Sequence, residues 1–218
     1  TMAENVRAAI EACKAGAAVW HVHTREADGL PSRDPAIVKE TIERVFEKCP
    51  DIVTSVLTYT DFTKQGADHL RPCVEHLKAA GPRYIQSTPL NVQSGTYDGK
   101  YTRLFTKDIY SEMIRYLESR KVRPEFQCDE YPAQRNVEEW VIKTGIAKDP
   151  PLVNMMAGFH GRSFASPAAG DPWKFAHVAS VLQSFPKNAV VGLCAGGRNW
   201  FPFTTFAMML GVDMAIRK

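Results

Sequence analysis

The stretch AAVWHVHT, residues 17–24, carries the clearest sign of the fold: an apolar, β-branched run that ends with two histidines one residue apart. Such a run predicts a β-strand. Side chains alternate between the two faces of a strand, so His21 and His23 project from the same face with their rings close together. Two imidazoles placed in this way form half of a metal site. We favour this interpretation over a hydrogen-bonded pair of core histidines.

Short apolar runs of the same kind recur about every thirty residues, and each is followed by a longer stretch with helical spacing of its apolar positions. Strict alternation of this kind predicts right-handed βαβ units and a parallel sheet. The seven predicted strands are residues 17–24, 51–59, 83–88, 124–129, 152–157, 188–195 and 212–217. Predicted helices include residues 34–49, 106–121 and 171–185.

A parallel sheet of βαβ units can form either of two architectures, an open doubly wound sheet or a closed barrel. The turn after the first predicted strand, HTREADGLPSRD at 23–34, lacks the glycine-rich phosphate fingerprint of the open Rossmann sheet. The chain also begins inside a predicted helix and ends on a predicted strand. We therefore predict one (β/α)8 TIM-barrel domain over residues 1–218, truncated at both ends, whose first strand and last helix lie outside these residues.

Composition narrows the class of ligand. The formal net charge of +3 comes from scattered lysines and arginines without a basic tract, which argues against binding to nucleic acid or a membrane surface. No apolar stretch is long enough for a transmembrane helix. Five separated cysteines without a CxxC pair indicate reduced thiols. We expect a cytoplasmic protein that binds small molecules.

Polar and charged residues at the ends of the predicted strands supply further candidates, because barrel enzymes build their sites at the carboxyl ends of strands. Arg217 lies among apolar neighbours, where a charge needs a carboxylate partner from the protein or a substrate, and Glu125 invites the same argument. Arg198 follows a glycine pair that is typical of an anion-binding turn and also of an ordinary entry into a helix. His160 is a candidate third metal ligand, with a ligand outside residues 1–218 as the alternative. An imidazole pair suits zinc, with iron, nickel or cobalt as alternatives.

Residues 15–32, AGAAVWHVHTREADGLPS, resemble the signature of the β-keto acid cleavage enzyme family: A-G-A-A, then H-x-H-x-R, then D-G-x-P-S. RPEF at 123–126, the GGR turn around Arg198 and GVDMAIRK at 211–218 agree with the family in the same order. The resemblance implies a zinc-dependent (β/α)8 barrel and a homo-oligomer, either a dimer or a tetramer. It also implies an enzyme that condenses a β-keto acid with acetyl-CoA and releases acetoacetate and a new acyl-CoA.

The resemblance also implies roles for individual residues. His21 and His23 match the zinc-binding histidines, and Arg217 matches the arginine of a terminal motif whose glutamate, a third zinc ligand, and aspartate, the base, would follow Lys218. With Arg217 and Glu125 as catalytic candidates, the substrate-binding candidates are Thr58, Ser87, Thr88 and Arg198. The match is loose at Thr58, where LTYTD replaces the family's STGG or TTGG, and at Ser87 and Thr88 in QSTPLN.

Two other functions are considered. An amidohydrolase-type hydrolase also carries His-x-His on a barrel strand, but it needs histidines on two middle strands, and residues 124–129 and 152–157 contain none. A non-catalytic barrel that binds a metabolite is the other alternative. Metal content distinguishes these classes, because either enzyme should copurify with a transition metal and a binding protein need not.

Overall fold

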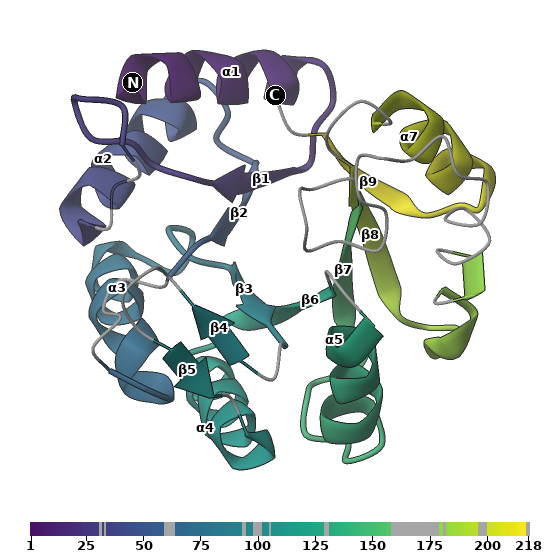
Figure 1. The fold of residues 1–218 in the computed structure, drawn as a ribbon. Coiled ribbons are helices and arrows are strands. Elements are labelled where there is room, and N and C mark those ends of the chain that lie inside the picture. Colours follow the sequence, from purple (N-terminus) through teal and green to yellow (C-terminus); the bar gives the residue numbers. More distant parts are fainter. Residues whose placement is uncertain are drawn as a thin grey trace. The chain divides into compact units, whose positions relative to one another are not determined.

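The chain forms alternating parallel strands and helices in a computed structural model (Figure 1). The residues that the structure describes are 1–30, 32, 34–58, 64–92, 95–97, 102–104, 106–128, 131–157, 179–180, 182–195 and 200–216. The chain divides into two compact units. Unit 1 comprises Thr1–Pro89 and Arg115–Pro124, and unit 2 comprises Leu90–Ile114 and Glu125–Lys218.

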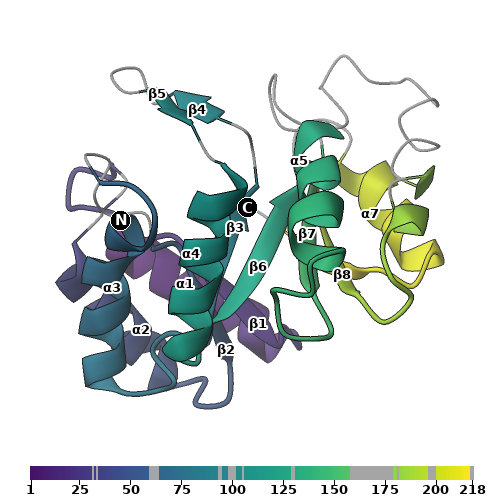
Figure 2. The same cartoon turned by 90° about the horizontal axis from the view of Figure 1, so that it is seen from below.

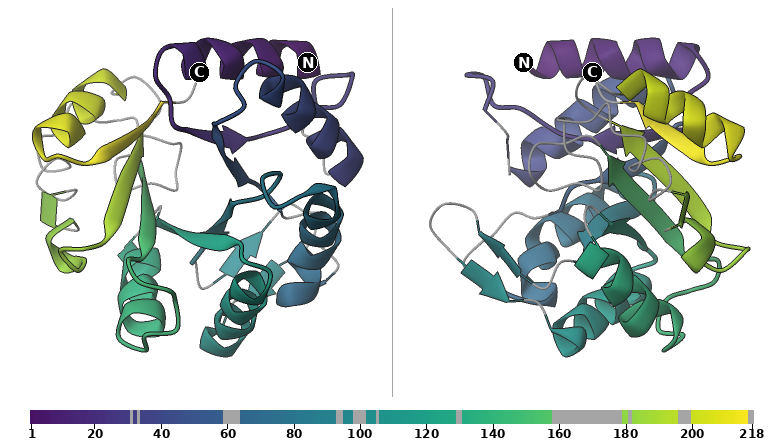
Figure 3. Two further views of the ribbon diagram at one scale, coloured as in Figure 1. Left: turned by 180° about the vertical axis from the view of Figure 1, so that it is seen from behind. Right: turned by 45° about the vertical axis from the view of Figure 1, so that its right-hand side comes forward.

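Unit 1 holds the first strands and the helices that follow them in the chain. Its strands run parallel in the order β1-β2-β3, and helices α1, α2 and α3 lie on the outer side of these strands (Figures 1 and 3). The helices are α1 (Met2–Lys14), α2 (Pro35–Phe46) and α3 (Ala67–Ala80), and the strands are β1 (Val19–Val22), β2 (Val53–Val56) and β3 (Ser87–Asn91).

Local sequence sets the ends of these helices. Asp34 caps α2 by accepting a hydrogen bond from the Ala36 amide at 2.8 Å, and Pro35 occupies the first helical position, as the Asp-Pro pair predicts. Gly16 follows the end of α1 with φ of 101° and Gly81 ends α3 with φ of 146°, values that favour glycine over other residues. The prediction that the chain begins in a helix is confirmed by α1.

The core of unit 1 lies between α1, α2 and the start of β2. Four buried residues form its centre, and partly buried apolar side chains from α1, β1 and α2 pack around them. The buried residues are Ala9, Val45, Cys49 and Ile52, and the surrounding ones are Val6, Ile10, Cys13, Trp20 and Phe46. This packing fixes the entry of the chain into β1 and β2, and so the path of the strand that carries His21 and leads directly to His23.

Unit 2 holds the later strands, which run parallel in the order β6-β7-β8-β9. Helix α7 packs against β8 and β9 through Phe203, Thr204 and Ala207. The strands are β6 (Arg123–Cys128), β7 (Leu152–Ala157), β8 (Val190–Ala195) and β9 (Asp213–Ile216). The helical segments are α5 (Tyr131–Asn136), the π-helical η1 (Val137–Ile142) and α7 (Trp200–Met209), and α4 (Lys107–Ser119) is shared by both units.

The strand order of the main sheet, β1-β2-β3-β6-β7-β8-β9, follows the order of the strands along the chain. Sequential parallel strands joined through helices are the arrangement of a (β/α) barrel fold, as predicted. Six of the seven predicted strands match observed strands closely. No helix in the described part of the chain is long and apolar enough to cross a membrane. The prediction of a single domain truncated at both ends stays a prediction.

The third predicted strand, 83–88, is displaced in the structure, where β3 covers Ser87–Asn91. The Tyr84 amide donates to the carbonyl of Gly81, which holds this segment in a turn. Ile85 is fully buried without belonging to a strand. The apolar pattern therefore marked burial and not sheet pairing.

A second difference is the antiparallel hairpin of β4 (Gly95–Tyr97) and β5 (Thr102–Leu104), which the strand pattern did not predict. The hairpin follows the carboxyl end of β3 in the chain (Figure 2). Most of the predicted helix at 171–185 lies outside the described residues.

Candidate active site

His21, in β1, and His23, which directly follows β1, form the centre of the candidate site in unit 1. The Nε2 atom of His21 lies 2.9 Å from the Nε2 atom of His23. The ring centroids are 4.7 Å apart, and the ring planes make an angle of 68°. Both side chains are half-buried. The same-face placement predicted from strand alternation is therefore observed, and the two rings direct the same nitrogen atom toward a common point.

Ser55 on the neighbouring strand holds the ring of His21 from its other side. The Ser55 hydroxyl lies 3.0 Å from Nδ1 of His21, and the two residues are directly paired in the register of β1 and β2. Ser55 is 1% exposed. This contact leaves Nε2 as the nitrogen of His21 that faces His23.

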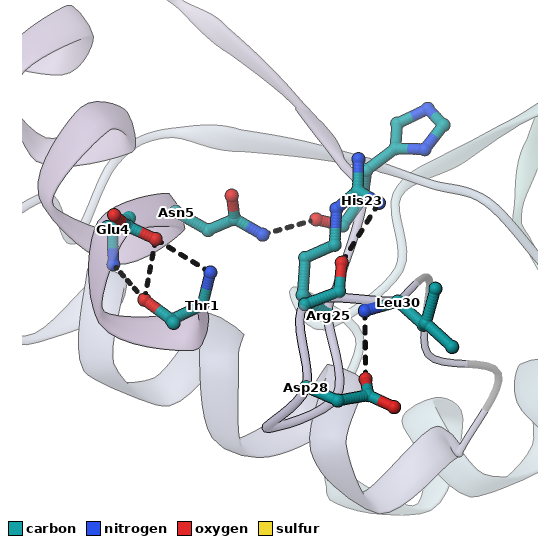
Figure 4. Close-up of polar contacts among 8 residues, drawn as sticks. Thr1, Glu4, Asn5, His23, Arg25, Asp28 and Leu30 are labelled. Atoms are coloured by element: carbon teal, nitrogen blue, oxygen red, sulfur yellow. Dashed lines mark hydrogen bonds and ion pairs between the residues drawn. The ribbon is translucent and has the colours of Figure 1, made fainter.

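The backbone of His23 is anchored separately from its ring. The side-chain amide of Asn5, on α1, donates to the carbonyl of His23 at 2.7 Å, while the imidazole points away from Asn5 (Figure 4). Helix α1 therefore fixes the backbone of the chain directly after β1.

Residues 28–30, which begin the D-G-x-P-S motif, form a tight turn. The Leu30 amide donates to the side chain of Asp28 at 2.9 Å, and the Arg25 guanidinium donates to the carbonyl of Gly29 at 3.3 Å (Figure 4). Gly29 has φ of 87°, a conformation that a side chain disfavours. The Asp-Gly pair of the motif thus has a structural role in closing the turn beside the histidines.

Of the three hydroxyl residues predicted to bind substrate, only Ser87 shares a row with the histidine pair. His21 pairs with Ser55 across β1 and β2, and Ser55 pairs with Ser87 across β2 and β3. Because side chains alternate along a strand, Thr88 projects from the opposite face of β3. The Ser87 hydroxyl donates to the carbonyl of Thr54 at 3.4 Å.

Thr58 and Thr88 form a buried hydroxyl pair of their own. Their oxygen atoms are 2.8 Å apart, and Thr88 also donates to the carbonyl of Val56 at 2.7 Å. A hydroxyl has one hydrogen, so Thr58 must be the donor to Thr88. Both side chains are fully buried. The hydrogens of both hydroxyls are thus already used within the protein, and their role in substrate binding stays a prediction.

Glu125 belongs to unit 2, near the start of β6, and is 7% exposed. The side-chain amide of Asn154, on β7, donates to its Oε2 at 3.4 Å. A buried carboxylate beside an amide donor can act as a hydrogen-bond acceptor or a proton carrier. Its catalytic role stays a prediction.

Several candidates lie outside the described residues: Arg198, Arg217 and His160. Within the part of the chain that is described, no group of three histidine, cysteine, aspartate or glutamate side chains is arranged to hold a metal ion. Ser55 is the site residue that sequence reasoning missed. Ser55 can be identified as a site residue because it is the polar residue that pairs with His21 on the next strand. This pairing is known only once the register of the two strands is known.

The histidine pair itself suits a transition metal. Two nitrogens bound to one zinc ion at about 2.0–2.1 Å in tetrahedral geometry lie about 3.3 Å apart. The observed 2.9 Å separation is within a few tenths of an ångström of this value. The donor chemistry also fits, because neutral imidazole is a preferred zinc ligand. The other ring nitrogen of a metal-binding histidine usually donates to an oxygen atom, and the Ser55 hydroxyl supplies an oxygen at that position for His21.

A family model described as beta-keto acid cleavage enzyme matches residues 1–216 of the chain. The chain belongs to this family. A 3-keto-5-aminohexanoate cleavage enzyme of Acetoanaerobium sticklandii is 24% identical over 214 residues, which is 97% of this chain and 71% of the relative. A 3,5-dioxohexanoate:acetyl-CoA acetone transferase of Paraburkholderia graminis is 26% identical over 235 residues, covering 96% of this chain and 71% of the relative.

Solved structures agree with the fold. The ternary complex of ObcA with a C4-CoA adduct and oxalate matches with a TM-score of 0.72 at 16% identity, over 100% of this chain and 56% of that chain. The apo structure of ObcA matches with a TM-score of 0.75 at 15% identity, over 100% of this chain and 54% of that chain. The chain thus spans just over half the length of the ObcA chains. At this identity the likeness supports the fold alone.

Proposed function

We propose that this protein is a zinc-dependent β-keto acid cleavage enzyme that condenses a β-keto acid with acetyl-CoA and releases acetoacetate and a new acyl-CoA. The observation that carries the proposal is the paired Nε2 atoms of His21 and His23 in a chain of this family. Acetyl-CoA as the second substrate is supported by relatives whose names include it, among them a 3-dehydrocarnitine:acetyl-CoA trimethylamine transferase of Rhizobium meliloti. Membership in the family speaks against an amidohydrolase-type hydrolase.

His21 and His23 would hold the metal through their Nε2 atoms. Zinc bound there supplies a Lewis acid for the carbonyl and carboxylate oxygens of a keto acid. The histidines contribute neutral donors whose positions are fixed by the Ser55 hydroxyl and by the backbone contact from Asn5. A third ligand is required for a catalytic zinc site, and His160 or a residue outside residues 1–218 would supply it.

The remaining candidates would bind and orient the substrates. We assign Arg217 to the substrate carboxylate, because a guanidinium pairs with a carboxylate through two parallel hydrogen bonds. Glu125 would act as a hydrogen-bond acceptor or proton carrier. Ser87 would contact substrate from the row that it shares with His21, Arg198 would bind an anionic group of either substrate, and Thr58 and Thr88 would act through their remaining lone pairs.

The test is a screen of β-keto acids with acetyl-CoA, using the intact protein and following acetoacetate release. We expect turnover of at least one keto acid, loss of turnover after treatment with a chelator, and its return on addition of zinc. The matched control is the His76→Ala variant, which removes an exposed histidine from α3. If turnover survives complete removal of the metal, the proposed zinc dependence is wrong. If a β-keto acid is consumed without release of acetoacetate, the proposed reaction is wrong.

We also propose that the protein is a homo-oligomer in the cytoplasm. Helix α7 contains no charged residue and exposes several large apolar side chains. These residues are Trp200 (48% exposed), Phe201 (63%), Met208 (58%) and Met209 (80%). Exposed apolar side chains gathered on one helix are typical of an interface, where each partner contributes about 800 Å². The absence of charge suits pairing with a second copy, since like residues meet across a twofold axis.

The five free cysteines support the cytoplasm as the location, because thiols stay reduced in that compartment.

Light scattering during gel filtration tests self-association. We expect the wild-type protein to be a dimer or tetramer, and the Phe201→Lys, Met209→Lys double variant to dissociate. Leu30→Lys, which changes an exposed apolar residue of unit 1, should leave the mass unchanged. A monomeric wild-type protein, or a double variant that stays assembled, contradicts this proposal.

A further inference from the structure

We propose that Ser55 is a positioning residue for the histidine pair: its hydroxyl selects the tautomer of His21 in which Nε2 carries no hydrogen and can bind a metal ion. This inference rests on the proposed role of His21 and His23 as metal ligands. The family signature in residues 15–32 does not include Ser55, which lies on the next strand.

The first support is the fixed geometry of the contact. Ser55 and His21 are direct partners in the parallel ladder of β1 and β2, so both backbones are held by the sheet. The hydroxyl oxygen lies 3.0 Å from Nδ1 of His21. With 1% of Ser55 exposed, water has little access to compete for this contact. The ring of His21 is therefore oriented from one side by Ser55 and from the other by His23.

The second support is the position of the hydrogens. Two ring nitrogens at 2.9 Å, as seen for His21 and His23, require a hydrogen between them, because two facing lone pairs would repel. A metal ion can be bound by both Nε2 atoms only when neither carries a hydrogen. In a neutral imidazole that hydrogen must then lie on Nδ1. For His21, the acceptor that faces Nδ1 is the Ser55 hydroxyl.

Serine suits this position because a hydroxyl can both donate and accept. In the metal-free pair, Ser55 can donate to Nδ1 while Nε2 of His21 donates to His23. When the metal binds, the hydroxyl turns and accepts the hydrogen of Nδ1. A carboxylate could only accept, and alanine could do neither. Ser55 therefore allows His21 to change tautomer without leaving a buried ring nitrogen unsatisfied.

The experiment compares three variants with the wild-type protein. Ser55→Ala removes the hydroxyl, Ser55→Thr retains it, and Thr54→Val removes the adjacent buried hydroxyl, which donates to the carbonyl of Arg83 at 2.9 Å on the opposite face of β2. Zinc affinity of the metal-free protein is measured by competition with a chromophoric chelator. We expect an affinity about 10–100-fold weaker in Ser55→Ala, recovery in Ser55→Thr, and no change in Thr54→Val.

A second measurement needs no variant. Nitrogen-15 NMR of labelled histidines reports the tautomer of each ring, and we expect His21 in the zinc-loaded wild-type protein to carry its hydrogen on Nδ1. A hydrogen-free Nδ1, or a Ser55→Ala protein with wild-type zinc affinity, overturns the role of Ser55 and leaves the metal site intact. If the wild-type protein binds no zinc, or His21→Ala binds it equally well, the proposed function itself fails. The NMR measurement tests the tautomer of His21 in the wild-type protein, so it tests the role of Ser55 even if Ser55→Ala does not fold.

Discussion

His21 and His23 direct their Nε2 atoms at one another across 2.9 Å, from the third residue of β1 and from the residue that directly follows this strand. Strand pleating brings the two rings to the same face, and separate contacts to Ser55 and to the backbone of His23 hold them there. The orientation of the two rings is therefore set before any ligand arrives. Binding by such a pair loses less conformational freedom than binding by mobile side chains.

Removal of the paired imidazoles should remove the metal. We expect the His21→Ala, His23→Ala double variant to copurify with no zinc, and each single variant to bind it at least about 100-fold more weakly, because a single histidine leaves the site one donor short. Elemental analysis of the purified protein and a chelator competition measure both quantities. His76→Ala is the matched control. Unchanged metal content in the double variant would show that these residues are not the ligands.

Loss of the Thr88 hydroxyl should lower stability. In Thr88→Val, the carbonyl of Val56 loses its donor and the buried Thr58 hydroxyl loses its acceptor, which we expect to cost about 1–3 kcal/mol in the free energy of unfolding. Urea denaturation measures this cost. Thr144→Val, which removes a helix-surface hydroxyl bonded to the carbonyl of Trp140, should cost much less. An increased KM for the keto acid without loss of stability would favour substrate binding by Thr88 instead.

Neutralising the Glu125 carboxylate should impair catalysis more than folding. Glutamine keeps the size of the side chain and can still accept a hydrogen bond from Asn154, but it cannot carry a proton. We expect kcat to fall by about 100-fold or more in Glu125→Gln. Glu139→Gln, on the surface of η1, is the control. Activity within a factor of about two of wild type would exclude proton transfer by Glu125.

Arg217→Met should lower acetoacetate release by orders of magnitude while the circular dichroism spectrum stays that of the wild-type protein. The reason is that methionine retains much of the apolar stem and lacks the guanidinium that would pair with the substrate carboxylate. We expect Arg217→Lys to recover only part of the activity, since an ammonium cannot form the two parallel hydrogen bonds. Near-wild-type turnover in the methionine variant would contradict the assigned role.

Alkaline pH should destabilise the protein through Cys73. Burial raises the pKa of this thiol from 9.0 to about 12, so the folded state retains a proton that the unfolded state loses above pH 9. This contribution to stability is complete below pH 9 and is lost as pH rises toward 12. We expect the free energy of unfolding to fall by up to about 1.4 kcal/mol per pH unit from this group in that range. Urea titrations at several pH values should show a shallower decline in Cys73→Ala, and equal slopes would rule out the linkage.

Much of the fold follows from patterns within short segments. Short apolar runs identified six of the seven strands, and the Asp-Pro pair at Asp34 and the glycines at 16 and 81 mark helix ends in the local sequence. The alternation of side chains along an extended chain placed His21 and His23 on one face. These features depend on backbone geometry over a few residues, which is why the sequence determines them without knowledge of the tertiary structure.

The partners of these residues were decided only by the tertiary structure. Ser55 meets His21 across 34 residues of chain, and Thr58 meets Thr88 across 30, because the register of β1, β2 and β3 brings them together. The start of β3 likewise depends on a turn that keeps the buried Ile85 out of the sheet. Local periodicity shows which face a side chain occupies. The register between strands depends on packing of the whole unit, so only the folded chain determines which hydroxyl supports the histidine pair.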